Sequence, residues 1–288
     1  MKTRTLNQRV RLASLALVAG TGLAAGSIAQ ANGTINLAYV EWSSEVASTN
    51  VIAAALEQAG FDVELTSLSA AAMFQALSSG DADAIVAAWL PTTHADYMER
   101  LGGNVEDLGM NLDGTKLGLV VPAYTDVDSI ADLNDNADSF NGEIIGIDPG
   151  AGLMSLTEEV VDTYDLGLNL RSGSGATMTA ALSSAINNEE DIVVTGWTPH
   201  WMFARFDLKY LEDPEGVYGG AEQIHTVVRQ GLKDDMPEAY AILDAFEWTP
   251  EQMGEVMLMN QEDGADPYES AQKWVENNQD VVEQWLNN

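Results

Sequence analysis

The chain has 288 residues, of which 46% are apolar, and it combines 45 acidic residues with 12 basic residues and no cysteine. This length and apolar content are enough for a core in two lobes and argue against a disordered chain. A formal charge of −33 argues against nucleic acid and anionic membranes as partners, and the lack of cysteine excludes disulfides, Cys-ligated zinc and thiol catalysis.

Residues 1–31 have the organisation of a secretory signal peptide. A basic start precedes a short apolar stretch, and Ala29-Gln30-Ala31 has the small-x-small form of a cleavage site. We therefore expect cleavage after Ala31 and a periplasmic product. The acidic residues are scattered along the rest of the chain, which indicates adaptation to high salt, as in a halophile, because salt screens the repulsion between like charges.

The remaining chain alternates strand-type apolar runs with helical patterns. Strands and helices alternate from the start over residues 35–40, 44–58, 63–68, 70–77, 84–89, 95–101 and 117–121. The middle part repeats this plan with a helix from 129, a strand over 144–147, helices over 151–164 and 178–186, and a strand over 192–197. The C-terminal part is mostly helical, with Thr249-Pro250 and Asp266-Pro267 as helix starts.

This order predicts an α/β fold of two lobes, each a mixed, mostly parallel sheet flanked by helices. We expect lobe 1 to comprise residues 32–121 and 225–288, and lobe 2 to comprise residues 122–224. Hinge segments near 121–126 and 224–231 would join the lobes across a cleft.

Three tryptophans lie at the ends of predicted strands: Trp42, Trp89 and Trp197. Ligands of open parallel sheets bind beyond the carboxyl ends of the strands. The three indoles are therefore candidates for an aromatic cage that holds a quaternary ammonium group by cation–π attraction. The alternative is that each is an ordinary buried aromatic. We interpret the other four as ordinary buried aromatics: Trp201, Trp248, Trp274 and Trp285.

A glycine-rich turn at residues 146–152 lies between a predicted strand and a predicted helix. Its open backbone N–H groups and the helix start suit an anion such as a carboxylate, although a plain tight turn has the same composition. His94, five residues after Trp89, is either a further donor to that carboxylate or a surface histidine. Glu41 and Glu45, which flank Trp42, are interpreted as solvated or helix-start acids.

The sequence contains no nucleophile-elbow, zinc-protease or phosphate-loop motif, and its three histidines have no metal-ligand spacing. An exported two-lobe protein with a candidate cage and no catalytic motif is typical of solute capture. We therefore expect a protein that binds a small molecule, without enzyme activity and without a cofactor.

Four stretches resemble the glycine betaine/proline betaine-binding proteins of osmoprotectant ABC transporters: residues 37–51, 87–94, 146–152 and 195–203. The resemblance implies a type II periplasmic-binding-protein fold. It implies that Trp42, Trp89 and Trp197 form a box around the trimethylammonium group. It further implies that the N–H groups of Gly146 and Ile147 hold the ligand carboxylate, assisted by His94. The partner would be an ABC permease, and we expect a monomer without a lipid anchor.

Other interpretations stay open. The same fold could bind choline, carnitine, dimethylsulfoniopropionate or ectoine, and choline has no carboxylate to occupy the turn at 146–152. An exported enzyme acting on quaternary amines is a second alternative, and a binding protein that hands its ligand to a receptor is a third.

Overall fold

The structure, a computed structural model, describes residues 32–287. The predicted signal peptide, residues 1–31, lies outside the described residues. Along residues 32–287, no helix combines the length and the apolar character that a membrane crossing requires.

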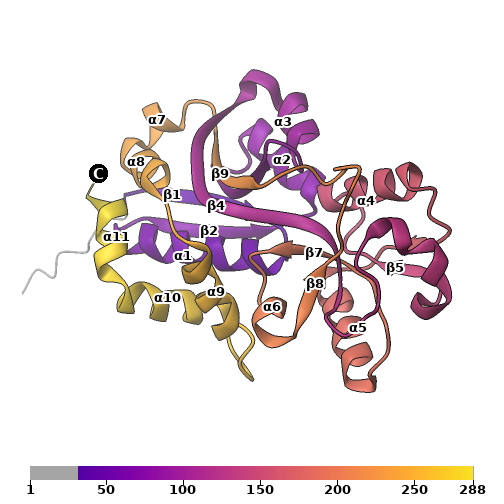
Figure 1. Ribbon diagram of the computed structural model, residues 1–288. Helices are drawn as coiled ribbons and strands as arrows, with labels where there is room; N and C mark the ends of the chain where they lie inside the picture. Colours follow the sequence, from indigo (N-terminus) through magenta and orange to yellow (C-terminus); the bar gives the residue numbers. More distant parts are fainter. Residues whose placement is uncertain (1–31, 288) are drawn as a thin grey trace, which may run out of the picture. The chain divides into compact units, whose positions relative to one another are not determined.

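The strands form one nine-stranded mixed sheet in the order β2-β1-β3-β9-β4-β7-β5-β6, and β8 pairs with β4 beside this path (Figure 1). They are β1 (Thr34–Tyr39), β2 (Asp62–Ser67), β3 (Ala84–Leu90), β4 (Val105–Pro122), β5 (Glu143–Ile145), β6 (Asn169–Arg171), β7 (Val194–Thr198), β8 (Leu208–Tyr210) and β9 (Glu222–Arg229). Parallel pairs join β1 to β2 and β3, and β5 to β6 and β7. Every antiparallel pair involves β4 or β9.

β4 divides this sheet into two groups of strands. Its residues 105–115 pair with β9, and its residues 116–122 pair with β7 and β8. We call β1, β2, β3 and β9 the first strand group, and β5, β6, β7 and β8 the second strand group. One strand of 18 residues therefore connects the two groups.

Helices cover both groups. They are α1 (Ser43–Gln58), α2 (Ala70–Ser79), α3 (Ala95–Leu101), α4 (Gly152–Thr163), α5 (Gly175–Asn188), α6 (Met202–Arg205), α7 (Leu232–Asp235), α8 (Pro237–Ala245), α9 (Pro250–Met259), α10 (Pro267–Asn277) and α11 (Gln279–Leu286), with 3₁₀ turns η1 (Gly102–Asn104), η2 (Ile130–Asp132) and η3 (Asn134–Phe140). In the second group, α4 and α5 contact β7. The C-terminal helices lie beside the first group, as Figure 1 shows in yellow and indigo.

α1 is buried on almost all sides because it lies between the sheet and the C-terminal helices. It contacts β1, β2 and β3 on one side and α8, α9 and α10 on the other. Small residues such as Ala47, Ala53 and Ala55 let both layers approach closely, and Ser48 and Thr49 are buried with them. The first turn of α1, which follows Trp42, is thereby fixed in the core.

The observed elements differ from the expected ones where the sequence carries little periodicity. The segment from 129 forms η2 and η3 and no α-helix, because its Asn and Asp side chains compete for backbone hydrogen bonds. β4 begins at Val105, well before the expected strand over 117–121, and Gly109 and Gly114 interrupt its apolar pattern. β6, β8 and β9 were not expected.

Candidate functional site

One cavity lies where β1, β3 and β7 end, and it brings together most of the predicted site residues. Its empty volume is about 320 Å³, including space open to solvent. Its lining consists of Trp42, Ser44, Trp89, Thr93, His94, Leu117, Ile147, Ala151, Gly152, Leu153 and Trp197. The three candidate cage tryptophans, His94 and Ile147 therefore meet at one site, and Gly146 is not part of the lining.

The three indoles of the cavity are buried: Trp42 is 8% exposed, Trp89 6% and Trp197 4%. Trp42 Nε1–H donates to Asp148 Oδ2 at 2.9 Å, and Trp197 Nε1–H donates to Ser44 Oγ at 3.2 Å. A buried indole N–H needs an acceptor. Because these two N–H groups already have one, neither needs an acceptor from whatever occupies the cavity.

His94 is built into the turn that follows β3. Its backbone N–H donates to Trp89 O at 2.9 Å, and its Nδ1 accepts from Trp89 N–H at 3.0 Å. Glu222, a buried carboxylate at the start of β9, accepts from the N–H groups of Thr92 and Thr93 at 2.6 and 2.8 Å. β9 therefore holds the turn that carries both Trp89 and His94.

Burial sets the protonation state of His94. The side chain is 1% exposed, and desolvation lowers its pKa to about 4, so the ring is neutral at pH 7. Since Nδ1 accepts a hydrogen bond, the ring proton is on Nε2. His94 thus offers one N–H donor at the cavity, and its ring stacks on Trp42 with centroids 6.3 Å apart.

The two backbone amides expected to hold a carboxylate differ in availability. Gly146 N–H donates to Arg171 O at 2.9 Å, which continues the pairing of β5 with β6. Ile147 N–H lies 3.2 Å from Met154 Sδ, a weak acceptor that a carboxylate can replace. In this structure Ile147 presents an N–H at the cavity wall, whereas the N–H of Gly146 belongs to the sheet.

The start of α4 contributes to the same wall. Its N-cap, Ala151, makes no side-chain capping bond, and Gly152 and Leu153 line the cavity. The N-terminus of a helix favours an anion. A glycine is required here by close approach, since a Cβ on Gly152 would lie 2.0 Å from Thr93 O, which comes from the first strand group.

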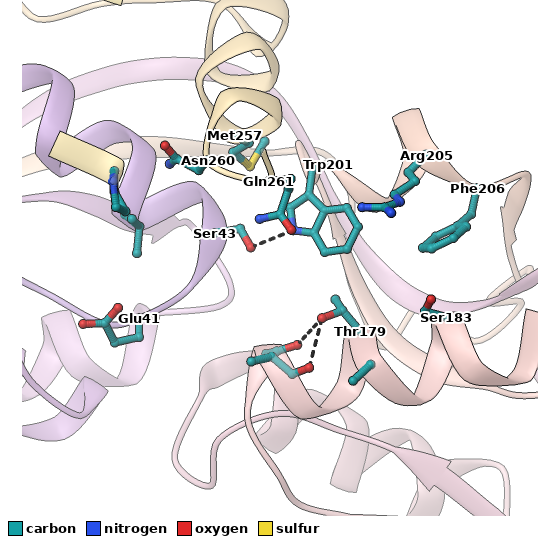
Figure 2. Close-up of a pocket in the computed structure, with 15 residues that line it drawn as sticks. Glu41, Ser43, Thr179, Ser183, Trp201, Arg205, Phe206, Met257, Asn260 and Gln261 are labelled. Carbon is teal, nitrogen blue, oxygen red and sulfur yellow. Dashed lines mark hydrogen bonds between the residues drawn. The ribbon is translucent and has the colours of Figure 1, made fainter. Parts of the chain in front are cut away.

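A wider pocket adjoins the first turn of α1 and is shown in Figure 2. Its empty volume is about 1010 Å³, including space open to solvent, and none of the candidate cage residues lines it. Thr179 and Ser183 of α5 face it from one side, and Met257 of α9 faces it from the other. Trp201 Nε1–H donates to Ser43 Oγ at 3.2 Å along its wall.

The remaining tryptophans lie elsewhere. Trp248 lies against Trp274 with ring centroids 5.9 Å apart, and Trp274 stacks on Trp285 at 6.3 Å. Phe246 contacts Trp285 at 4.9 Å. This cluster belongs to the core beneath the C-terminal helices and lines neither of the two pockets described above.

Sequence reasoning did not single out several lining residues: Ser44, Thr93, Leu117, Ala151 and Leu153. Ala151 lies within the predicted glycine-rich turn at residues 146–152, and Leu153 follows that turn directly. Ser44 could have been inferred from the need of a buried indole for an acceptor. Leu117 carries no signal beyond its place in an apolar run.

The lining combines a neutral aromatic half with a half that presents N–H donors. It contains no Lys, Arg, Asp or Glu, so neither charge of a zwitterion would meet a fixed ion there. Within residues 32–287, no group of three or more His, Cys, Asp or Glu side chains is arranged to hold a metal. The cavity suits a small molecule with an apolar cation at one end and a carboxylate at the other.

The sequence is similar to known binding proteins. The family model OpuAC, described as the substrate binding domain of ABC-type glycine betaine transport system, matches residues 33–277. The glycine betaine/carnitine transport binding protein GbuC of Listeria monocytogenes is 52% identical over 154 residues, which cover 52% of this chain and 51% of the relative. The chain thus spans about half the length of that curated relative.

The fold is similar to solved structures over nearly all described residues. Lactococcal OpuAC, in a closed-liganded conformation with glycine betaine, is 46% identical with a TM-score of 0.84, covering 88% of this chain and 99% of that one. A choline binding protein of an ABC transporter, in complex with choline, is 30% identical with a TM-score of 0.82, covering 88% and 91%. These matches confirm the expected type II periplasmic-binding-protein fold.

Proposed function

Because the chain belongs to the family of substrate-binding domains of ABC-type glycine betaine transport systems, we propose that it captures glycine betaine, or a related quaternary-ammonium osmoprotectant, and delivers it to an ABC permease. One observation carries this proposal. Three indoles, the Nε2–H of a neutral His94 and the N–H of Ile147 line a single cavity of about 320 Å³.

The trimethylammonium group would occupy the box formed by Trp42, Trp89 and Trp197. Each cation–π contact contributes about 0.5–2 kcal/mol, and the larger values apply to desolvated sites such as this one. The rings also remove water from the methyl groups, which stabilises the complex further. This attraction survives strong salt better than an exposed ion pair, because a buried contact is screened less.

The carboxylate would lie against His94 and the start of α4. His94 Nε2–H and Ile147 N–H would donate to it, and the end of the helix dipole would stabilise its charge. Gly146 would join this set only if the ligand displaced Arg171 O from its N–H. We therefore place His94 and Ile147 ahead of Gly146 as carboxylate ligands.

Capture would occur by closure of two lobes. We propose lobe 1 as residues 32–121 and 225–288 and lobe 2 as residues 122–224, joined by hinges near 121–126 and 224–231. The pairing of β4 with both strand groups supports two lobes, because this strand passes from one group to the other near residues 115–116. Ligand bound to both lobes favours the closed form, which the permease would recognise.

The cellular setting is part of the same proposal. The chain would be exported by the signal peptide of residues 1–31, act in the periplasm as a monomer without enzyme activity, and work at high salt. The formal charge of −33 supports the last point. Thermal unfolding in low and in molar salt tests it, and a melting temperature that does not depend on salt would contradict it.

Choline is the second candidate ligand, because the chain is also similar to a choline binding protein. Choline would fill the indole box but has no carboxylate. It would leave His94 Nε2–H without a ligand acceptor in a buried site, which costs about 1–3 kcal/mol, and Ile147 N–H with only the weak acceptor Met154 Sδ. Glycine betaine should therefore bind more tightly than choline.

The test is a titration of the chain from residue 32 in high salt, followed by tryptophan fluorescence and calorimetry. Glycine betaine, carnitine, choline and ectoine serve as ligands. Saturable binding of betaine, tighter than that of choline, is the expected result. Tighter binding of choline would show that His94 and Ile147 do not hold a carboxylate. No binding of any of the four ligands would refute capture of these osmoprotectants.

A further inference from the structure

Two tryptophans donate hydrogen bonds from one strand group to the other, and one of them, Trp42, lines the cavity. Trp42, which follows β1 of the first group, donates its Nε1–H to Asp148, which follows β5 of the second group, at 2.9 Å. On the neighbouring turn the direction is reversed. Trp201, which follows β7 of the second group, donates its Nε1–H to Ser43 of α1 at 3.2 Å.

Ser43 receives a second donor from the same turn. His200 Nδ1 accepts from Met202 N–H at 3.1 Å, so its ring proton is on Nε2, and Nε2 lies 3.3 Å from Ser43 Oγ. The His200 side chain is buried, and desolvation lowers its pKa to about 3, so the ring is neutral at pH 7. One serine hydroxyl of the first group therefore accepts two N–H groups of the second group, and Figure 2 shows the bond from Trp201.

Neither acceptor is part of the cavity lining. Asp148 lies outside it, in a pocket bounded by Trp42 and Pro149, and Ser43 lines the wider pocket of Figure 2. Asp148 can therefore act on the ligand only through the Trp42 ring that it holds, and Ser43 only through the contact that it makes between the two strand groups. This separates them from Ser44, which also accepts an indole N–H but does line the cavity.

We propose that Asp148 and Ser43 are positioning residues that fasten the closed form from both sides of the cleft, so that they set the rate at which ligand leaves. This inference rests on the proposed function. Opening the cleft breaks these hydrogen bonds before the cage can release its ligand. In the open form water replaces the partners, so the acceptors contribute little to the stability of either lobe.

The hydrogen bond from Trp42 to the Asp148 carboxylate is stronger than either hydrogen bond to the Ser43 hydroxyl. A carboxylate acceptor gives a charge-assisted bond, which is about twice as strong as a neutral one. It also fixes the plane of the Trp42 ring, and cation–π attraction depends on the ring face pointing at the cation. Loss of Asp148 should therefore accelerate release more than loss of its charge alone.

The experiment measures association and dissociation rates of glycine betaine by stopped-flow tryptophan fluorescence. The variants are Asp148→Ala, Asp148→Asn and Ser43→Ala. Asp148→Asn keeps an acceptor oxygen of similar reach and removes only the charge. We expect koff to rise about tenfold in Asp148→Ala and Ser43→Ala and about threefold in Asp148→Asn, with kon almost unchanged.

A matched control is available among the C-terminal helices. Trp274 Nε1–H donates to Glu255 Oε2 at 3.2 Å, between α9 and α10 and away from the cleft. Glu255→Ala removes the same kind of bond, so it should leave koff unchanged. The melting temperature of each ligand-free variant shows whether a substitution acts on folding instead of on closure.

The outcomes separate the two proposals. If the unaltered chain does not bind betaine, the proposed function fails. If it binds betaine but Asp148→Ala and Ser43→Ala release it at the original rate, only the fastening role fails. The fastening role would also fail if both Asp148 variants lowered the melting temperature of the ligand-free protein in proportion to their rise in koff. Asp148 would then be a structural residue.

Discussion

Replacing the buried Glu45 by glutamine should stabilise the protein at high pH and leave its stability almost unchanged near pH 4.5. Glu45 lies in the first turn of α1 and is 1% exposed. Its Oε2 accepts from Val40 N–H at 2.5 Å, and its Oε1 has no partner. Desolvation raises its pKa from 4.5 to about 8, because burial disfavours the charged form.

The sign follows from proton linkage. Between pH 4.5 and about 8 the folded chain holds a proton that the unfolded chain has lost, so a rise in pH favours unfolding across this window. The stabilisation is complete below pH 4.5 and is lost as the pH passes the folded-state pKa. One pKa unit corresponds to about 1.36 kcal/mol, so the cost above pH 8 reaches ~5 kcal/mol.

The assay is thermal unfolding of the unaltered chain and of Glu45→Gln at several pH values in one concentration of salt. At pH 9 the variant should melt roughly 10–20 °C higher, since 1 kcal/mol shifts Tm by about 2–4 °C in a chain of this size. The exposed neighbour Glu41 supplies the control, because Glu41→Gln makes the same substitution outside the core. A difference between the two proteins that is the same at pH 5 and at pH 9 would refute the reasoning.

Three further predictions concern the cavity. Trp197→Ala should raise the Kd for glycine betaine about 30-fold or more, since cation–π attraction reaches about 2 kcal/mol in desolvated sites, whereas Trp197→Phe should raise it only a few-fold. Calorimetry measures both Kd values, and a Kd for Trp197→Ala equal to that of the unaltered protein would show that this ring is not part of the cage. Gly152→Ala should weaken binding strongly while the chain still folds. The added methyl group meets Thr93 O at 2.0 Å only when the start of α4 and the turn after β3 are together. Unchanged affinity would show that ligand binding does not need this close contact. Betaine affinity should stay constant from pH 8 to pH 5 and fall only as the pH nears 4, where His94 becomes protonated and loses its acceptor at Nδ1; a fall centred near pH 6.5 would contradict the neutral, buried ring.

The general architecture was predictable because local sequence patterns indicate most of the strands and helices. Apolar runs such as β3 alternate with helical spacing, and tryptophans at strand ends lie at one edge when the strands are parallel. Trp42, Trp89 and Trp197 meet at one cavity for this reason. The glycine-rich turn between β5 and α4 was visible from its composition and its place in the order of elements.

What the sequence could not supply are the pairings between distant segments. β9 lies between β3 and β4, and no local sequence pattern predicts that it pairs with these two strands. The hydrogen bond that occupies the Gly146 N–H depends on β6, a strand of three residues without apolar alternation. The burial of α1 likewise depends on α10, which contacts it from the far end of the chain.

The place of β9 in the sheet has a consequence for the order in which the protein forms during synthesis. The strands of the second group, with the part of β4 that pairs with them, lie within residues 116–210 and are complete first. The first group begins the chain, yet β3 lacks its neighbour until residues 222–229 have been made. Until then the apolar edge of β3 is unpaired, a state that invites pairing with other chains. The half that carries Trp42 and Trp89 is thus started first and finished last. A ribosome that stops before residue 222 leaves the turn after β3 without Glu222, which holds it, and leaves β3 with an exposed edge.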